Sequence, residues 1–166
     1  MRRLLIDVNV VLDAVLDRPR HSEAAAKLWG AVESKQTEAL IPAHGLTTFF
    51  YLVARDRGSA VARRTLRSVL RTFGVATVDA AVIQRAVALD WRDFEDAVCA
   101  AAAEASGCDG IVTHDPKGFP GCALPVMSAE TAVALLLGAP PDRVSDAPRQ
   151  RRRGGRPRTR RPAATS

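Results

Sequence analysis

Carboxylates of the kind that bind a divalent cation occur in three places along the 166-residue chain. These are Asp7, the group Asp93, Glu95 and Asp96, and Asp115. Carboxylates that gather without a lysine partner raise one another's pKa, and a bound cation relieves that repulsion. Oxygen ligands without cysteine or histidine favour Mg²⁺ or Mn²⁺ over Zn²⁺. One or two such ions can activate water and stabilise a phosphodiester under attack, so these residues predict metal-dependent phosphodiester chemistry.

The acidic groups can meet only if the fold brings strand ends and helix starts to one edge. Asp7 and Asp115 each follow a short apolar run of the strand type. The third group opens a predicted helix at 93–106, directly before the run that leads to Asp115. In open parallel α/β sheets, ligands bind beyond the carboxyl ends of the strands, where the helices also begin. We therefore expect Asp7, Asp96 and Asp115 to lie together at this edge.

Short apolar runs alternate with helical patterns along the chain. We predict strands at 4–6, 39–41, 75–78, 110–113 and, as a weak edge strand, 124–126. We predict helices at 8–16, 23–34 (capped by Ser22), 45–55, 60–73, 80–89 (capped by Asp79), 93–106 and 129–137 (capped by Ser128). Such alternation indicates right-handed βαβ crossovers. The predicted fold is a three-layer α/β/α sandwich over residues 1–138, with a central, mostly parallel sheet of four or five strands.

Positive charge is concentrated at the end of the chain. The net charge is +6, but eight arginines lie after residue 148; without them, 16 basic side chains face 18 acidic ones. Residues 139–166 lack apolar periodicity, so we predict a disordered, Arg/Pro-rich basic tail. This tail either attracts phosphate backbones without sequence selectivity or reflects the composition of a GC-rich coding sequence. Similarly, the arginines of the predicted helix at 60–73 either form a solvated face or guide RNA.

Cysteine usage and the N-terminal residues bear on the compartment. The three cysteines show no CxxC spacing, which favours reduced thiols. Only three apolar residues precede Asp7, too few for a signal peptide. The alanine-rich segment at 97–105 is too short to span a membrane. We expect a cytoplasmic protein.

Three sequence motifs carry a resemblance to a known family. The run Asp7-Val8-Asn9-Val10-Val11-Leu12-Asp13 resembles the opening DxNVLLD of PIN domains. Asp96-Ala97-Val98 with its alanine-rich helix resembles the family's DA motif, and 111–115 with Phe119 is similar to its closing vTxDxxxF. The motifs stand in the family's order, and the resemblance spans residues 3 to about 137. The chain is similar to the VapC-type ribonuclease toxins of type II toxin–antitoxin systems.

This resemblance implies a function and a set of site residues. It implies Mg²⁺-dependent cleavage of RNA, with Asp7, Asp96 and Asp115 sharing the metal. It also implies that Asn9 orients groups around Asp7 and that the protein is a homodimer neutralised by a small cognate antitoxin. As residues that contact the substrate we predict Asn9, Thr113 and Thr48. Each residue also has a local interpretation. Asp7 and Asp93 are suited to cap helices, Asp115 suits a turn, and Asn9 and Thr113 suit local hydrogen bonds.

One position departs from the family's pattern. Where the family has a glutamate early in the helix after the second strand, this chain has Thr48 nearest the expected place. A hydroxyl can hold a metal-bound water but adds no negative charge. We hypothesise that Glu95, or with less support Asp93, replaces the missing carboxylate. If nothing replaces it, the alternative function is a catalytically weak or silent PIN-like module for RNA or protein interaction.

The remaining polar residues carry weaker signals. We expect Asp13 and Asp17 to be surface or capping residues, and His21 and His44 to be structural or surface residues. We expect the same of His114, although its position next to Asp115 would let it touch phosphate. A third functional class is a phosphatase or receiver domain with Asp7 as phosphate acceptor. Against that class, no well-placed lysine follows the later strand.

Overall fold

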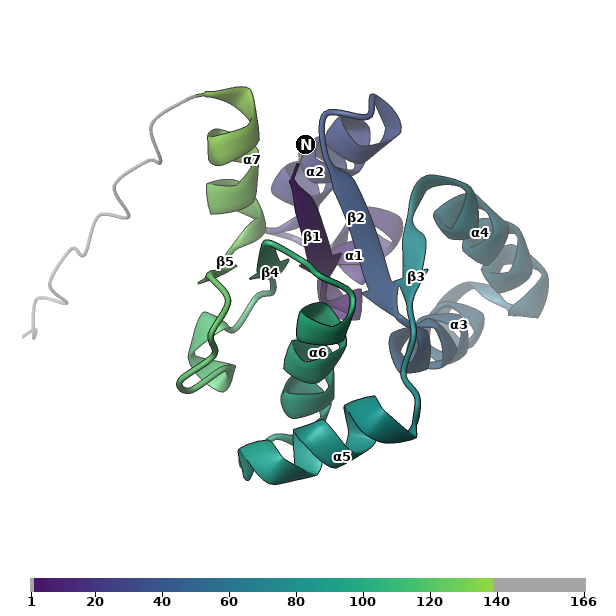
Figure 1. Ribbon diagram of the computed structural model, residues 1–166. Coiled ribbons are helices and arrows are strands. Elements are labelled where there is room, and N and C mark those ends of the chain that lie inside the picture. Colours follow the sequence, from purple (N-terminus) through teal and green to yellow (C-terminus); the bar gives the residue numbers. More distant parts are fainter. Residues whose placement is uncertain (1, 139–166) are drawn as a thin grey trace, which may run out of the picture.

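Five parallel strands form the central sheet of the computed structural model, which describes residues 2–138 (Figure 1). The strands are β1 (Arg3–Ile6), β2 (Glu38–Pro42), β3 (Gly74–Ala76), β4 (Gly110–Val112) and β5 (Val126–Met127). Their order in the sheet is β3-β2-β1-β4-β5, and each neighbouring pair is parallel. The strand order therefore changes direction between β1 and β4, which is where open α/β sheets bind ligands.

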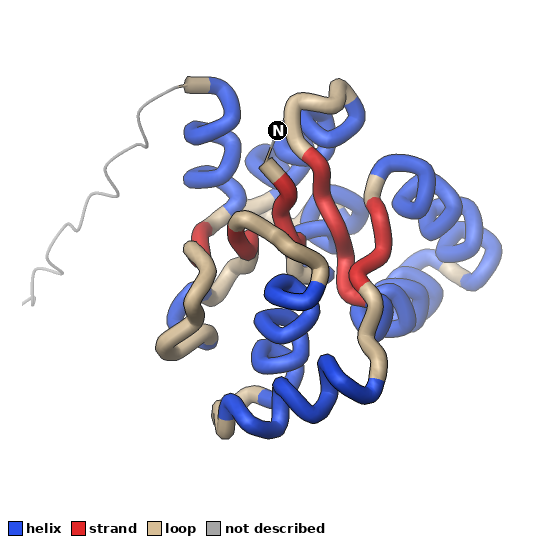
Figure 2. The backbone as a smooth tube through the Cα atoms, in the orientation of Figure 1, coloured by secondary structure: helices blue, strands red, loops and turns tan. Residues whose placement is uncertain are grey.

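Helices cover both faces of this sheet (Figures 1 and 2). They are α1 (Val8–Leu16), α2 (Ser22–Glu33), α3 (Ala43–Arg57), α4 (Ser59–Thr72), α5 (Ala80–Leu89), α6 (Phe94–Ala105) and α7 (Ala129–Leu137). Helix α2 packs against α1 and α7 on one face, and α5 packs against α6 on the other. Helices α3 and α4 pack together alongside β2 and β3. The predicted α/β/α sandwich is confirmed, with five strands.

Successive side chains of β1 point to opposite faces of the sheet, and the core accordingly consists of two apolar clusters. Leu4 and Ile6 join the cluster of α1, α2 and α7, whereas Leu5 joins the cluster of α6. The alanines at 100–103 of α6 are at most 1% exposed, so this helix lies close against the sheet. Because α6 leads into β4, its first turn lies at the carboxyl edge of the strands.

Several predicted boundaries are corrected. Strand β3 ends at Ala76, because the chain then turns toward Asp79, which caps α5 by accepting a hydrogen bond from Val82 N. Ser22 is the first residue of α2 and not its cap; the cap position belongs to His21, which makes no capping bond with its side chain. Helix α3 begins earlier than predicted, directly after Pro42, because proline suits a helix start.

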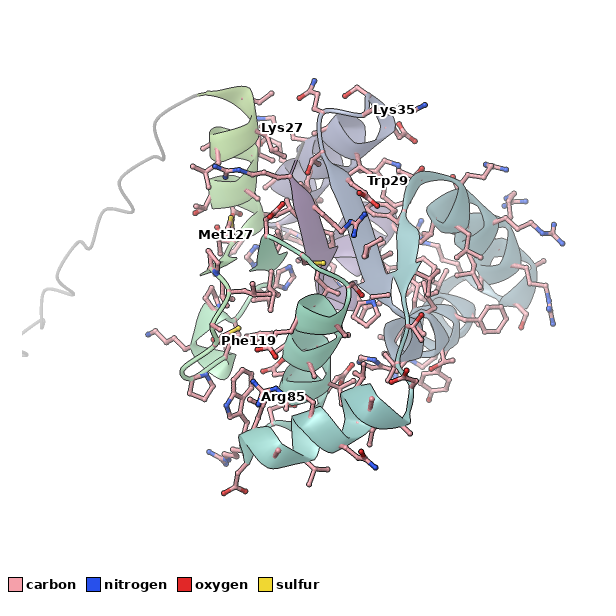
Figure 3. The ribbon with its side chains drawn as sticks, in the orientation of Figure 1. Lys27, Trp29, Lys35, Arg85, Phe119 and Met127 are labelled. Atoms are coloured by element: carbon pink, nitrogen blue, oxygen red, sulfur yellow. The ribbon has the colours of Figure 1, made fainter. Side chains whose placement is uncertain are left out.

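The connection from β4 to β5 contains a short 3₁₀ turn, η1 (Pro116–Gly118), which the sequence did not predict. Phe119 follows this turn and is 5% exposed. Its ring meets that of Trp91 edge to face, with centroids 5.8 Å apart, and Figure 3 shows Phe119 beside α6. This buried ring fixes the loop that carries Asp115 against the helix that carries Asp96.

The predicted basic tail at 139–166 lies outside the described residues. Within residues 2–138, no helix combines the length and the apolar character needed to cross a membrane. The cysteines Cys99, Cys108 and Cys122 are free thiols, as predicted.

Candidate active site

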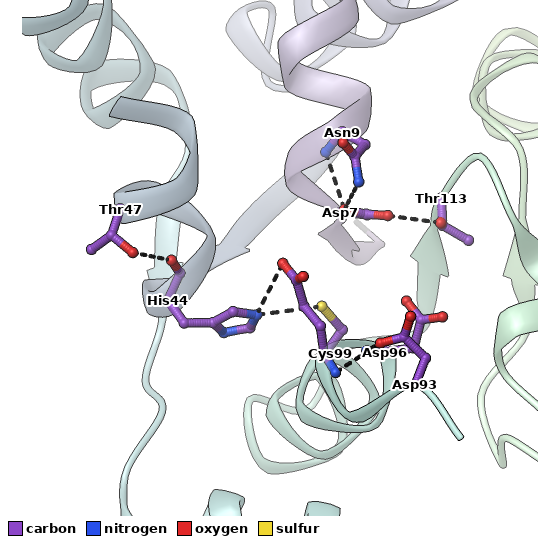
Figure 4. Close-up of polar contacts among 9 residues, drawn as sticks. Asp7, Asn9, His44, Thr47, Asp93, Asp96, Cys99 and Thr113 are labelled. Atoms are coloured by element: carbon purple, nitrogen blue, oxygen red, sulfur yellow. Dashed lines mark hydrogen bonds and ion pairs between the residues drawn. The ribbon is translucent and has the colours of Figure 1, made fainter. Parts of the chain in front are cut away.

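Asp7 lies at the carboxyl end of β1, where it is held by three hydrogen bonds. It is 8% exposed and caps α1, since Oδ1 accepts from the backbone nitrogen of Asn9 at 3.1 Å. The Asn9 amide nitrogen approaches the same oxygen at 3.5 Å, and Thr113 Oγ1 donates to Oδ2 at 2.8 Å (Figure 4). The capping and site interpretations of Asp7 are therefore compatible. The same bonds that start the helix also orient the carboxylate.

Strand β4 ends beside Asp7. The backbone nitrogen of Asp7 donates to Val112 O at 2.9 Å, and Thr113, 2% exposed, turns its hydroxyl toward Asp7. That hydroxyl also accepts from the backbone nitrogen of Asp115 at 3.3 Å. Asp115 caps the 3₁₀ turn by accepting from the nitrogen of Lys117 at 3.2 Å. Thr113 therefore links the carboxylate of Asp7 to the backbone of Asp115.

The start of α6 supplies the third carboxylate. Asp93 is the N-cap and accepts hydrogen bonds from the backbone nitrogens of Glu95 and Asp96 at 2.9 and 3.3 Å. Asp96 occupies the first turn and is partly buried. Burial and the nearby charges of Asp93, Asp7, Asp115 and Glu95, in that order, raise the pKa of Asp96 from 3.8 to about 7. The predicted division of roles, with Asp93 as cap and Asp96 facing the acidic cluster, agrees with this geometry.

Gly118 marks the point where Asp96 and Asp115 approach each other. A Cβ atom at this position would overlap Asp96 Oδ2, and it would lie 3.8 Å from Asp115 Oδ2. The two carboxylates thus face one small space from opposite sides. With Asp7 joined to Asp115 through Thr113, the structure brings together the three carboxylates that are far apart in sequence.

Among residues 2–138, no lysine or arginine forms an ion pair with Asp7, Asp96 or Asp115. Burial first, and then the charges of this unneutralised cluster, raise the pKa of Asp96. A divalent cation coordinated by oxygen is the group whose charge and ligand preference fit such a set. The residues present therefore fit Mg²⁺ or Mn²⁺.

His44 is a member of the site that the sequence analysis missed. It lies in the first turn of α3, with Nε2 3.9 Å from Glu95 Oε1 and 3.9 Å from Cys99 Sγ (Figure 4). Burial lowers the pKa of His44, while Glu95 and Asp7 oppose that shift. Burial and the same acidic groups raise the pKa of the Cys99 thiol well above its usual value. His44 could have been found by its position, two residues beyond the end of β2 at the shared edge.

The other predicted residues differ in how close they lie to the acidic cluster. Glu95 is exposed at the rim of the cluster and faces His44. Thr48 is half-buried on α3, and within residues 2–138 it makes no hydrogen bond to the acidic residues; the hydroxyl that bonds near His44 belongs to Thr47. The expectation for Asp13 is wrong, because this residue is only 1% exposed.

Comparison with known proteins agrees with this fold. A family model described as PIN domain matches residues 3–117. No curated protein is significantly similar in sequence.

Among solved structures, the chain is similar to VapBC2 from Rickettsia felis bound to a DNA fragment from their promoter (TM-score 0.58, 16% identity, 76% of this chain and 97% of that chain). It is also similar to VapC20 of Mycobacterium tuberculosis, described as a Sarcin-Ricin loop cleaving toxin (TM-score 0.56, 18% identity, 69% and 92% covered). PAE2754 from Pyrobaculum aerophilum has a TM-score of 0.59 at 20% identity (82% and 96% covered). At these identities the likeness concerns the fold, and the family rests on the sequence match: the chain belongs to the PIN domain family.

Proposed function

We propose that the protein is a Mg²⁺-dependent endoribonuclease and the toxin of a type II toxin–antitoxin pair. The observation that carries the proposal is the convergence of Asp7, Asp96 and Asp115 without a basic partner at the carboxyl edge of the sheet. Membership of the PIN domain family and the similarity to VapC20, named for cleavage of the Sarcin-Ricin loop, support RNA as the substrate.

In this proposal Asp7, Asp96 and Asp115 hold Mg²⁺, with Mn²⁺ as a substitute. When bound, the cation supplies a water of lowered pKa and stabilises charge on the scissile phosphate. The chain's own groups hold the carboxylates in position: Thr113 and Asn9 fix Asp7, and the buried ring of Phe119 fixes the loop of Asp115. Thr113 and Asn9 therefore act by positioning, and their contact with substrate, like that of Thr48, stays a prediction.

Cation removal tests the proposal directly. The purified full chain should cleave labelled RNA when Mg²⁺ is present, and the cleavage should stop when EDTA is added. Asp7→Asn should lose the activity, because the amide carries no negative charge yet can still accept the hydrogen bonds that cap α1. Cleavage that persists in EDTA, or that survives Asp7→Asn, would rule out this site as its source.

Glu95 is proposed as the substitute for the carboxylate that Thr48 does not supply. Glu95→Gln should weaken Mg²⁺ binding, measured by calorimetry, by about tenfold, within the range for groups that support metal ligands. Glu104→Gln is the matched control, since Glu104 lies on the same helix but pairs with Arg85 away from the cluster. Equal Mg²⁺ affinity in Glu95→Gln and Glu104→Gln would refute the role of Glu95.

A catalytically silent interaction module is the second candidate, and Thr48 is the observation that favours it. The silent module and the ribonuclease predict different results when the protein is incubated with RNA. Binding of RNA would be measurable in a gel-shift experiment, while no cleavage would appear with Mg²⁺ or with Mn²⁺.

A groove between α3 and α4 is the proposed binding site of the antitoxin. It has a volume of about 540 Å³, and most of its lining is apolar or basic; the lining residues are Leu46, Thr47, Phe50, Arg63, Leu66, Arg67 and Leu70. Arg63 also lies over the ring of Phe50, 5.5 Å from its centroid. An antitoxin segment with apolar and acidic side chains would complement this lining. A short neighbouring gene for a DNA-binding protein would support the pairing, and the homodimer stays a prediction from family resemblance.

A further inference from the structure

A second cluster of metal-ligating side chains lies near the end of β4 and contains none of the three carboxylates of the acidic site. It consists of Asp13 on α1, His21 directly before α2, and His114 directly after Thr113. One ligand atom from each of the three residues lies within 4.8 Å of the other two. The three come from separate segments of the chain, so the fold itself assembles the group.

Asp13 is the residue that most requires an explanation. It is 1% exposed, and neither of its carboxylate oxygens has a hydrogen-bond partner. His114 Nε2 contacts Oδ2 as an ion pair, and Arg18 Nη1 lies 3.7 Å from Oδ1, but neither contact has the geometry of a hydrogen bond. These two ion pairs offset the charge of Asp13, but its oxygens remain without hydrogen bonds, which is costly for a buried carboxylate. Bonds to a metal would use these oxygens.

The two imidazoles are arranged around this carboxylate. The rings of His21 and His114 are stacked, with centroids 4.6 Å apart and planes 24° from parallel. Two stacked imidazoles repel each other if both are protonated, whereas neutral imidazoles are good metal ligands. Glu130 of α7 adds a carboxylate at the edge, with Oε1 3.9 Å from His21 Nδ1.

We propose that Asp13, His21 and His114 form a binding site for a divalent transition metal, with Zn²⁺ as the expected occupant. Two imidazoles and one carboxylate are a ligand set that suits Zn²⁺, in contrast to the oxygen-only set around Asp96. Ligand bonds to Zn²⁺ are about 2.0–2.2 Å long, so atoms already within 4.8 Å of one another need only small side-chain movements. The fourth ligand is water or Glu130.

Such a metal would strengthen links that the ion pair of Asp13 with His114 and the stacking of His21 on His114 already provide. It would tie α1 and the start of α2 to the residue between Thr113 and Asp115. Metal that binds the folded state alone stabilises it, so Zn²⁺ should raise the melting temperature of the protein.

Metal titration in excess Mg²⁺ tests this proposal separately from nuclease activity. Under the proposed function, Mg²⁺ would fill the oxygen-only site, and Zn²⁺ bound there instead would not respond to His21→Ala. The full chain should bind one equivalent of Zn²⁺, measured by competition with a chromophoric chelator. His21→Ala and His114→Ala should each weaken Zn²⁺ binding at least tenfold. Since His21 is exposed, His21→Ala is expected to fold. His114→Ala removes an ion-pair partner of the buried Asp13, so circular dichroism must first show that this variant is folded. His44→Ala is the matched control, because His44 is the third histidine of the chain and lies at the other cluster.

Cobalt distinguishes the ligands. Co²⁺ bound to Asp13, His21 and His114 should give weak visible d–d bands without the intense near-ultraviolet band of a thiolate ligand. A thiolate band would assign the metal to one of the three cysteines instead. That band, failure of the wild-type chain to bind Zn²⁺, or unchanged binding in His21→Ala would each overturn the proposal. Equal loss in His44→Ala would do so as well.

Discussion

Asp96→Asn should lower Mg²⁺-dependent RNA cleavage by about 10³-fold while leaving the fold intact. Stabilisation of transition-state charge by a metal is worth several kcal/mol, and each loss of about 1.4 kcal/mol is tenfold in rate. The amide keeps the size of the carboxyl group but adds no charge toward Asp7 and Asp115. Initial rates at saturating Mg²⁺, together with circular dichroism spectra, measure the two parts of this expectation.

Asp93→Asn is the matched control for this substitution. Asn is as good an N-cap as Asp, so the start of α6 and the bonds to Glu95 and Asp96 should persist. The variant removes the same charge three residues away, yet its cleavage rate should stay within a few-fold of the wild type. If both substitutions reduced cleavage equally, the assignment of Asp93 as cap and Asp96 as ligand would have to be abandoned.

The contribution of Asp96 to the stability of the metal-free protein should decrease as pH rises from about 4 to 7. The pKa of Asp96 is about 7 in the folded chain against an ordinary value of 3.8, because burial and neighbouring carboxylates disfavour its charge. Between these values the folded state binds more protons than the unfolded state, so folding becomes less favourable with rising pH. Above pH 7 this contribution is constant.

Comparison of wild type with Asp96→Asn isolates this effect from other titrating groups. In EDTA, the melting temperature of the variant should exceed that of the wild type at pH 8, and the difference should shrink toward pH 4. Mg²⁺ should stabilise the wild type at pH 8 more than at pH 5, where Asp96 is protonated. A difference between the two proteins that does not vary with pH would contradict the raised pKa of Asp96.

The acidic site was largely predictable from sequence because its members stand at element ends. Asp7 directly follows an apolar run, Asp115 comes three residues after the end of β4, and Asp96 lies in the first turn of an alanine-rich helix. The topology of a parallel sheet was therefore enough to bring them together. The same reasoning predicted the caps Asp79 and Ser128. Local sequence patterns are enough to predict the location of a residue in the fold when that residue stands at the end of a strand or the start of a helix.

Sequence patterns did not predict contacts that depend on the direction of a side chain or on the packing of elements distant in sequence. Asp13 lies in the opening motif and was expected at the surface, but the turn of α1 directs it inward to His114. His44 meets Glu95 only because α3 and α6 begin at the same edge. The 3₁₀ turn has a local signal, the Asp115 cap followed by Pro116, but the burial of Phe119 that holds this loop is a tertiary contact.

Gly118 illustrates a requirement for glycine that does not come from the backbone. Its φ is not in the left-handed region occupied by Gly58, Gly107, Gly121 and Gly138, so any residue could adopt its conformation. A first side-chain carbon at position 118 would instead meet the carboxylate of Asp96. A methyl group there would push this carboxylate aside, so Gly118→Ala should disturb the acidic centre more than the fold.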